Sequence, residues 1–198
     1  MLLDCKFLGV QDYLTTLREM QQFTKNRNID TVDEVWFLEH YGVFTQGKAG
    51  KDKHILADLK VINSDRGGQI TYHGPGQLVV YFLLDLVRNS LNLRKLIYLL
   101  SCSVMDLLTE YNITSHTKED APGVYVNGDK ICSIGLKIAK GCTYHGLSLN
   151  VNMDLQPFNQ INPCGDLNLK MTQLSNFVDQ VDVETVAERF SRIIRSKL

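Results

Sequence analysis

The segment at residues 66–77, RGGQITYHGPGQ, constrains the fold of this chain more than any other. It sets glycines and one proline among four polar side chains, Arg66, Thr71, Tyr72 and His73, and then runs directly into an apolar stretch at residues 78–84. Glycine allows close approach of the backbone to a ligand and positive φ angles at little steric cost. An apolar run bounded by such a loop is typical of a buried strand. We therefore predict a ligand-binding loop at the mouth of a sheet.

The composition is that of one ordinary globular domain spanning residues 1–198, with 44% hydrophobic and 22% charged residues. The net charge of −1 argues against broad binding to nucleic acid or to an anionic membrane. No apolar run approaches the length of about 20 residues that a membrane span needs. The N-terminal sequence MLLDCKFLGV lacks a basic region and a small-residue cleavage site, so we expect no signal peptide and a cytoplasmic protein.

Hydrophobic periodicity predicts helices and strands in an order typical of an α+β domain, with helices packed on a mixed or antiparallel sheet. Between them, KAGKDKH at residues 48–54 is expected to form a solvated, basic and mobile loop. A cap at Asp182 marks the start of the last helix. Helices are expected at residues 11–25, 93–111 and 183–195. Strands are expected at residues 33–39, 59–63, 68–72, 77–85, 124–126, 130–138 and 143–152.

One of these strands carries a lysine on an otherwise apolar face. With period-two alternation, Lys130 shares a face with Cys132, Ile134, Leu136 and Ile138. If this face is the core face, Lys130 points inward. It is then either a strand-edge lysine whose ammonium reaches water, or a partly desolvated lysine that activates a thiol beside a pocket. The strand alone leaves both interpretations open.

The five cysteines form no CxxC pair and are odd in number, which argues against a disulfide framework and a structural zinc site. Cys164 differs from the others because it stands in an Asn-Pro-Cys-Gly turn. Pro163 fixes the approach to this turn, and Gly165 leaves the sulfur uncrowded. Its local context is compatible with a plain loop cysteine and with a nucleophile.

The five histidines form no metal-ligand pattern, so we expect no metal. His145 alternates with Leu147 and Leu149 on a predicted strand, which favours a hydrogen-bonded core histidine over a ligand. The glycine-rich loop is not a phosphate-binding loop of known spacing, because GxxxxGK[ST] and GxGxxG are both absent.

Three segments, RGGQITYHGPGQLVVY, GDKICSIGLKI and GCTYHGLSLNVNMDLQPFNQINPCG, together resemble the lipoyl(octanoyl) transferase family, often called LipB. The resemblance covers roughly residues 33–170, and the segments agree with the family in order and spacing. It implies the α+β catalytic domain that this family shares with lipoate-protein and biotin-protein ligases.

The resemblance also implies roles for individual residues. Cys164 matches the acyl-accepting nucleophile of the family. Lys130 matches the lysine that favours the thiolate and assists proton transfer. The implied substrate-binding residues are Arg66, Gly67, Gly68, Gln69, Ile70, Thr71, Tyr72, His73, Ser133, Ile134, Gly135, Gly146, Leu147 and Ser148.

The reaction implied is transfer of an octanoyl group from the phosphopantetheine thioester of octanoyl-acyl carrier protein to a lysine ε-amine. The implied acceptors are lipoyl domains of 2-oxoacid dehydrogenase E2 subunits and the glycine cleavage H protein, and no cofactor is implied. Two alternatives stay open: an ATP-dependent lipoate or biotin ligase of the same fold, and a non-catalytic module that binds lipoyl domains or carrier proteins. Transfer from an acyl thioester without nucleotide distinguishes the transferase from the ligase.

Overall fold

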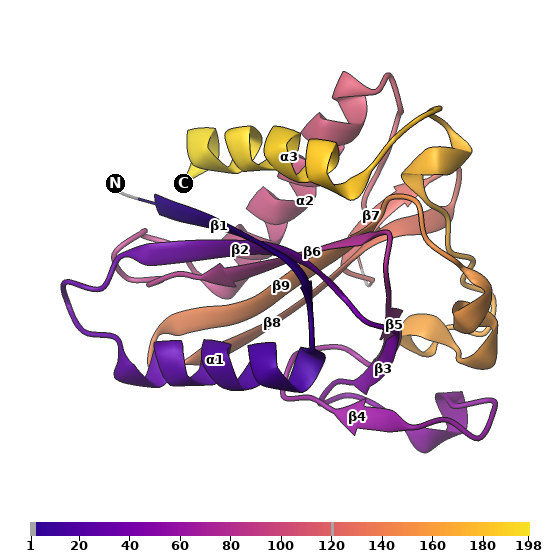
Figure 1. The fold of residues 1–198 in the computed structure, drawn as a ribbon, viewed down its shortest axis with the longest axis horizontal. Helices are drawn as coiled ribbons and strands as arrows, with labels where there is room; N and C mark the ends of the chain where they lie inside the picture. The colour runs from indigo at the N-terminus through magenta and orange to yellow at the C-terminus, as the bar shows by residue number, and fades with distance from the viewer. Residues whose placement is uncertain (1–2, 120) are drawn as a thin grey trace.

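The computed structural model describes residues 3–119 and 121–198, and it folds around two sheets (Figure 1). The larger sheet has the strand order β1-β2-β6-β9-β8-β7, and the smaller one β4-β3-β5. In the larger sheet β1 runs parallel to β2 while the other neighbours are antiparallel, so the predicted α+β class with a mixed sheet is confirmed. The strands are β1 Leu3–Gln11, β2 Asp33–His40, β3 Val43–Gln46, β4 Val61–Asn63, β5 Ile70–His73, β6 Gln77–Leu83, β7 Gly123–Val126, β8 Asp129–Ala139 and β9 Cys142–Asn150.

Three helices cover the larger sheet. The helices α2 (Leu93–Glu110) and α3 (Val183–Lys197) pack on one face, while α1 (Tyr13–Asn26) lies on the opposite face beside the smaller sheet (Figure 1). The Asp182 carboxylate accepts a hydrogen bond from the backbone N–H of Thr185, which confirms the predicted cap of α3. None of the helices in the described residues is long and apolar enough to cross a membrane.

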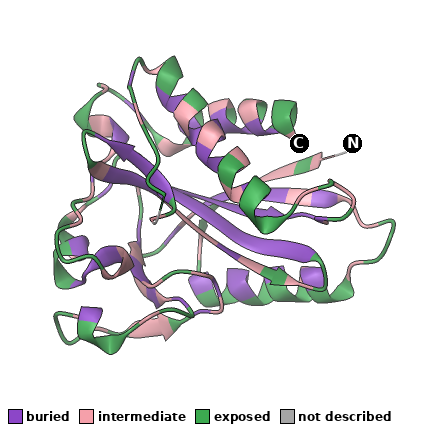
Figure 2. Ribbon diagram, turned by 180° about the vertical axis from the view of Figure 1, so that it is seen from behind, coloured by how far each residue is buried: buried purple, intermediate pink, exposed green. Residues whose placement is uncertain are grey.

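The central strands of the larger sheet are buried on both faces (Figure 2). Alternate residues of β6 divide between two apolar clusters: Val80 and Phe82 pack under α2 and α3, and Val79 and Tyr81 pack toward α1. A continuous apolar run is what a strand covered on both faces needs, which explains why residues 78–84 show no polar alternation.

The N-terminal strand β1 was not predicted. It occupies the edge of the larger sheet, where Phe7 remains half exposed and stacks on Phe37 of β2 with ring centroids 5.0 Å apart. An edge strand of mixed burial gives only a weak alternation signal. The helix predicted from residue 11 begins at Tyr13, because the Asp12 side chain accepts from the Thr15 backbone N–H and caps it.

A β-bulge corrects the predicted face of Lys130. In the pairing of β7 with β8, Tyr125 lies opposite Lys130 and Val124 lies opposite Cys132, which leaves Ile131 as an extra residue. Since Val124 and Tyr125 are adjacent in their strand, Lys130 and Cys132 point to opposite faces. Cys132 joins the core under α2 and α3, and Lys130 points to the other face. Lys130 is buried, which decides between the two open interpretations in favour of the desolvated lysine, but the predicted shared face with Cys132 is wrong.

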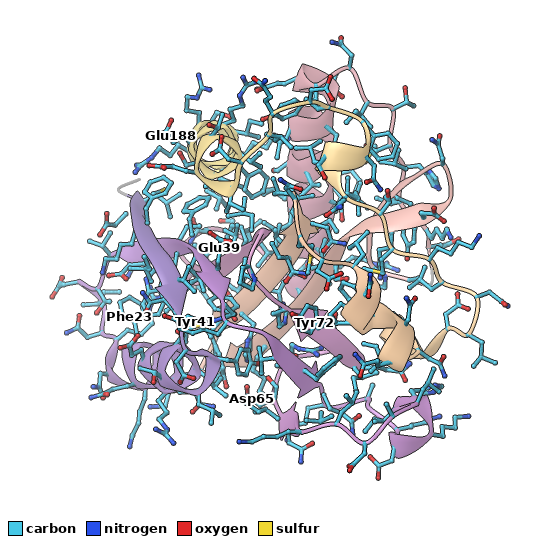
Figure 3. The ribbon with its side chains drawn as sticks, turned by 45° about the vertical axis from the view of Figure 1, so that its right-hand side comes forward. Phe23, Glu39, Tyr41, Asp65, Tyr72 and Glu188 are labelled. Carbon is cyan, nitrogen blue, oxygen red and sulfur yellow. The ribbon has the colours of Figure 1, made fainter. Side chains whose placement is uncertain are left out.

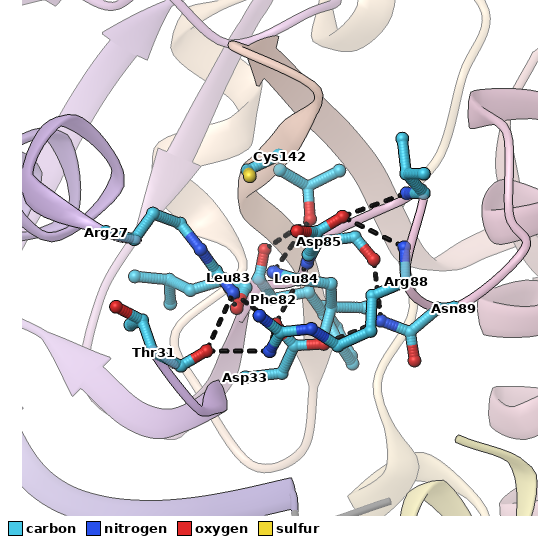
Figure 4. Close-up of polar contacts among 12 residues, drawn as sticks. Arg27, Thr31, Asp33, Phe82, Leu83, Leu84, Asp85, Arg88, Asn89 and Cys142 are labelled. Carbon is cyan, nitrogen blue, oxygen red and sulfur yellow. Dashed lines mark hydrogen bonds and ion pairs between the residues drawn. The ribbon is translucent and has the colours of Figure 1, made fainter. Parts of the chain in front are cut away.

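A buried carboxylate, Asp33, fastens α1 and the turn after β6 to the start of β2 (Figure 4). Its side chain pairs with Arg27 at the end of α1 and lies 3.6 Å from the Arg88 guanidinium. The Asn89 side-chain amide and the Asp85 backbone N–H also donate to it, at 2.6 and 3.0 Å. Paired and hydrogen-bonded in this way, the charge is compensated, and we assign the cluster a structural role.

Candidate functional site

The thiol of Cys164 and the ammonium of Lys130 meet although they are far apart in the sequence. Lys130 Nζ lies 3.1 Å from Cys164 Sγ, within hydrogen-bonding distance. Cys164 stands in the short 3-10 turn Pro163–Gly165, and Lys130 on β8. Lys130 is only 1% exposed, so the contact is largely shielded from solvent on the lysine side. Such a pair has the geometry that a thiolate–ammonium ion pair requires.

The turn presents the cysteine in an uncommon backbone conformation. Cys164 has a φ of 57°, in the left-handed region that non-glycine residues rarely adopt, and Gly165 follows with a φ of 76°. The Gln69 amide stabilises this turn, because its Nε2 donates to the Cys164 carbonyl at 2.8 Å. A Cβ at position 165 would lie 2.4 Å from that amide, so a larger residue there would displace Gln69 from the Cys164 carbonyl. Strain of this kind is a feature of functional turns.

Backbone hydrogen bonds fix both ends of the segment that carries Cys164. On one side, Asn162 N–H donates to the His54 carbonyl at 2.8 Å. On the other side, Lys130 N–H donates to the Lys170 carbonyl at 2.8 Å, and Thr172 N–H donates to the Lys130 carbonyl at 2.9 Å. The residue that contacts the sulfur is thereby also bonded through its backbone to the segment that presents the sulfur.

The side chain of Lys130 runs through a space that β7 leaves open. Its Nζ lies 5.4 Å from the centre of the Tyr125 ring, and a Cβ at Gly123 would lie 2.5 Å from its Cε. Burial opposes the charged form, but the charge of Cys164 and its hydrogen bond outweigh burial, and the pKa of Lys130 lies above its ordinary value. The geometry therefore favours an ammonium beside the sulfur.

A cavity opens beside this pair on the face of the larger sheet shared with α1. Gly135 keeps it open, because a Cβ there would lie 3.0 Å from the Gly67 carbonyl oxygen. Glycine at 146 is required by a close approach between strands, because a Cβ there would lie 2.0 Å from the Val80 carbonyl oxygen of β6. The walls of the cavity bring together all the predicted site residues except one. These are Cys164, Lys130, Arg66, Gly67, Gly68, Gln69, Ile70, Thr71, His73, Ser133, Ile134, Gly135, Gly146, Leu147 and Ser148.

The exception is Tyr72, which does not line the cavity. The centroid of its ring lies 5.0 Å from that of Phe44 and 5.8 Å from that of Phe158. Tyr72 thus belongs to a separate small core between β5 and residues 156–160 (Figure 3). Tyr72 lies between Thr71 and His73 on β5, and both of those residues line the cavity. The resemblance assigned a whole segment, and strand alternation turns Tyr72 away.

The cavity is also lined by four residues that the sequence did not assign to the site: Tyr13, Val79, Tyr81 and His145. Val79 and Tyr81 follow the period-two alternation of β6, so the signal was present once one face was known to be the pocket face. Tyr13 opens α1, a part of the chain outside the resemblance. His145 was interpreted as a core histidine.

Arg66 is, after Lys130, the second cavity residue whose charge is deeply buried without a carboxylate partner among the described ion pairs. Its guanidinium donates to the Thr45 carbonyl at 2.7 Å, to the Thr45 hydroxyl at 2.9 Å and to the Gly67 carbonyl at 3.0 Å. Burial lowers its pKa below the ordinary value, although arginine stays charged at neutral pH. The arrangement fixes the glycine loop and adds positive potential to the cavity.

His145 is a hydrogen-bonded, buried residue, as predicted, and it also touches the cavity. Its Nε2 lies 2.8 Å from Oδ1 of Asp65, which lies near α1 (Figure 3).

Burial lowers the pKa values of the neighbouring buried histidines, to about 3 for His73 and about 4 for His40, so both are neutral at pH 7. No cluster of three or more His, Cys, Asp or Glu residues suited to a metal ion occurs in residues 3–119 and 121–198.

Comparison with known proteins extends the resemblance from three segments to most of the chain. Residues 12–195 match the family model of the lipoyl protein ligase A/B catalytic domain. An octanoyltransferase of Haemophilus influenzae (strain PittEE) is 54% identical over 187 residues, covering 92% of this chain and 88% of that protein. An octanoyltransferase of Psychromonas ingrahamii is 56% identical over 173 residues, covering 86% of this chain and 80% of that protein.

Solved structures of low sequence identity share the fold. A lipoate-protein ligase A bound with ATP superposes with a TM-score of 0.82 at 13% identity, over 100% of this chain and 85% of that chain. A biotin protein ligase from Aquifex aeolicus gives a TM-score of 0.59 at 18% identity, over 100% of this chain and 69% of that chain. The expected catalytic-domain fold is thus confirmed, and at 54–56% identity to the two relatives the chain belongs to the octanoyltransferase family, within the lipoyl protein ligase A/B catalytic-domain family.

Proposed function

We propose that the protein is a lipoyl(octanoyl) transferase, which moves an octanoyl group from octanoyl-acyl carrier protein to a lysine ε-amine on a lipoyl domain. The observation that carries the proposal is the distance of 3.1 Å between Lys130 Nζ and Cys164 Sγ at the wall of a cavity. Membership of the octanoyltransferase family supports the same chemistry. The proposed acceptors are the lipoyl domains of 2-oxoacid dehydrogenase E2 subunits and the glycine cleavage H protein, and the proposed setting is a single catalytic domain, residues 1–198, in the cytoplasm.

In the first step, Cys164 as thiolate attacks the thioester carbonyl of the donor and forms a C–S bond. The C–S bond to phosphopantetheine breaks, and Lys130 donates a proton to the leaving thiolate, which is released as the free thiol. The products are an octanoyl-Cys164 thioester and a neutral Lys130 amine. The raised pKa of Lys130 in the resting protein suits this role, because the ammonium is retained until the thiolate charge disappears.

In the second step, the ε-amine of the acceptor lysine attacks the octanoyl-Cys164 carbonyl. Lys130, now neutral, accepts the proton that the attacking nitrogen loses, and the thiolate of Cys164 leaves. The amide is formed and the thiolate–ammonium pair is restored. One thioester is exchanged for another before the amide forms, so the sequence needs no nucleotide.

The cavity offers an apolar path for the acyl chain beside this pair. Val79 contributes an apolar wall, the rings of Tyr13 and Tyr81 lie on the same side, and Gly135 keeps the path open. An apolar chain enclosed in such a path gains about 0.8 kcal/mol for each buried methylene. The carbonyl at its end would then lie next to Cys164.

An ATP-dependent ligase is the second candidate, because a lipoate-protein ligase bound with ATP has the same fold. A ligase activates a free acid as an adenylate, and no step of that reaction requires a thiol nucleophile beside a lysine. The two functions separate in one experiment: intact-mass analysis after mixing the protein with octanoyl-acyl carrier protein and no nucleotide. A transferase gains one octanoyl group, whereas a ligase or a non-catalytic binding module gains none.

A further inference from the structure

The basic loop at residues 48–54 is bonded through its backbone to the glycine loop and to the segment that presents Cys164, two parts of the chain that line the cavity. At its start, Lys48 N–H donates to the Arg66 carbonyl at 3.0 Å and Ala49 N–H to the Gly68 carbonyl at 3.1 Å. At its end, the His54 carbonyl accepts from Asn162 N–H at 2.8 Å. These three bonds place the loop between the glycine loop and the segment that presents Cys164, with its lysines outside the cavity lining. The proposed chemistry assigns them no role.

The loop concentrates unpaired positive charge. Lys48, Lys51 and Lys53 are all exposed, and the ion pairs of the described residues include none of them. Asp52 is the one acidic residue in the segment, and its Oδ1 accepts a hydrogen bond from the Gln46 side chain at 3.1 Å. The segment thus carries two more positive than negative charges in a chain whose net charge is −1.

Two exposed leucines follow the loop and the nucleophile turn in the sequence. Leu56 follows the loop and is 56% exposed, with its N–H bonded to the Gln160 carbonyl at 2.9 Å. Leu167 lies two residues after Gly165 in the nucleophile segment and is 77% exposed. Apolar side chains among charges at the entrance to a site are typical of a surface that meets a protein. We call the five residues Lys48, Lys51, Lys53, Leu56 and Leu167 the rim surface.

We propose that the rim surface docks an acidic face of the carrier protein that delivers the acyl thioester. The inference rests on the proposed function, because the thioester must reach Cys164 through this entrance. The phosphodiester at the other end of the phosphopantetheine arm then stays outside the cavity, together with the carrier surface around it. An anionic group and an acidic surface complement three unpaired lysines. A lipoyl domain presents a lysine and no phosphate, so charge complementarity favours the carrier.

The test combines a charge-reversed rim with two acyl donors. The variant K48E/K51E/K53E changes side chains that lie outside the cavity and keeps the backbone bonds of the loop. Its acylation is measured with octanoyl-acyl carrier protein and with octanoyl-pantetheine, which has the thioester but neither phosphate nor protein. We expect kcat/KM for the carrier to fall by about 10- to 100-fold, and the rate with octanoyl-pantetheine to stay unchanged. The matched control K25E/R94E/K95E reverses three exposed charges on α1 and α2, and should behave as the wild type with both donors.

Salt dependence supplies a second measurement. Acylation of the wild type by the carrier should slow as ionic strength rises, and acylation of K48E/K51E/K53E should lose this dependence. Leu167→Ser should weaken the reaction with the carrier and spare that with octanoyl-pantetheine.

The outcomes separate docking from catalysis. Equal loss with both donors would overturn the inference and assign the loop to catalysis or folding. A defect confined to transfer from preformed octanoyl-enzyme to a lipoyl domain would overturn it in favour of acceptor docking. Unchanged kinetics with the carrier would also overturn it. Failure of the wild type to be acylated by either donor would refute the proposed function itself, a result that the carrier-specific defect cannot imitate.

Discussion

Removing the charge of Lys130 should change the reactivity of Cys164 far more than the stability of the fold. The substitution Lys130→Met keeps the length and apolar character of the side chain, and so retains its packing against Tyr125. What it removes is the ammonium 3.1 Å from Cys164 Sγ. We expect alkylation of Cys164 to require a higher pH, because the thiolate is the reactive species and loses its neighbouring cation.

The magnitude follows from the distance. Two unit charges 3.1 Å apart attract by about 1 kcal/mol at a dielectric constant of about 80, and by about 5 kcal/mol at about 20. Lys130 is buried and Cys164 is half-buried, so a value between these limits applies. A net loss of about 2 kcal/mol corresponds to a shift of about 1.5 pH units in the midpoint of the alkylation profile.

The assay is iodoacetamide alkylation over a pH series, followed by peptide mass mapping that resolves each cysteine. Cys102, half-buried on α2, serves as the internal control, and its profile should not move. Lys130→Arg should keep much of the wild-type profile because the charge remains. It should nevertheless slow transfer to the lipoyl domain more than it slows acyl-enzyme formation, because a guanidinium does not deprotonate. An unchanged Cys164 profile in Lys130→Met would refute the electrostatic role.

Three further predictions concern other parts of the protein. Cys164→Ala should abolish acyl-enzyme formation in the intact-mass assay, while the buried Cys132→Ala retains it; an octanoyl group mapped to Cys132 would contradict the assignment. Gly68→Val should block acylation with a smaller loss of thermal stability, since Gly68 has a φ of 81° that valine disfavours; normal acylation would make the loop purely structural. His73 has a folded pKa of about 3, below that of the unfolded chain, so unfolding takes up a proton as pH falls below about 6.5. This proton uptake should lower the free energy of unfolding by about 2 kcal/mol at pH 5 relative to pH 7. In denaturant titrations, the free energy of unfolding of His73→Gln should depend less on pH than that of the wild type. An equal pH dependence would contradict the buried neutral state of His73.

Glycines 67 and 68 show how far a motif alone can be interpreted. The loop was expected to use glycine for close backbone approach and for positive φ, and the two residues divide these roles: Gly68 has a positive φ, and Gly67 is not among the residues with positive φ. At Gly67 a Cβ would instead lie 3.2 Å from the Leu136 carbonyl oxygen, whose partner is the Gly67 N–H at 2.9 Å. The requirement for glycine there is a close approach between the loop and β8, and a close approach depends on the partner strand.

Local signals determined much of this protein from the sequence. The apolar run before residue 84, the helical stripe of α2 and the Asp182 cap of α3 lie within single elements, so periodicity and capping reveal them directly. The same holds for the Asn-Pro-Cys-Gly turn, which distinguished Cys164 from the other cysteines. Three matching segments were enough to indicate the family.

Tertiary structure decided the geometry of the site. The bulge at Ile131 turns Lys130 to the cavity face, away from Cys132, and a bulge exists only in the register between two strands. Pairing of residues 170–172 with Lys130 sets the end of the nucleophile segment, and Gln69 binds the Cys164 carbonyl from the loop before β5. These contacts join residues distant in the chain, and their free energy depends on the whole fold, so no local pattern contains them.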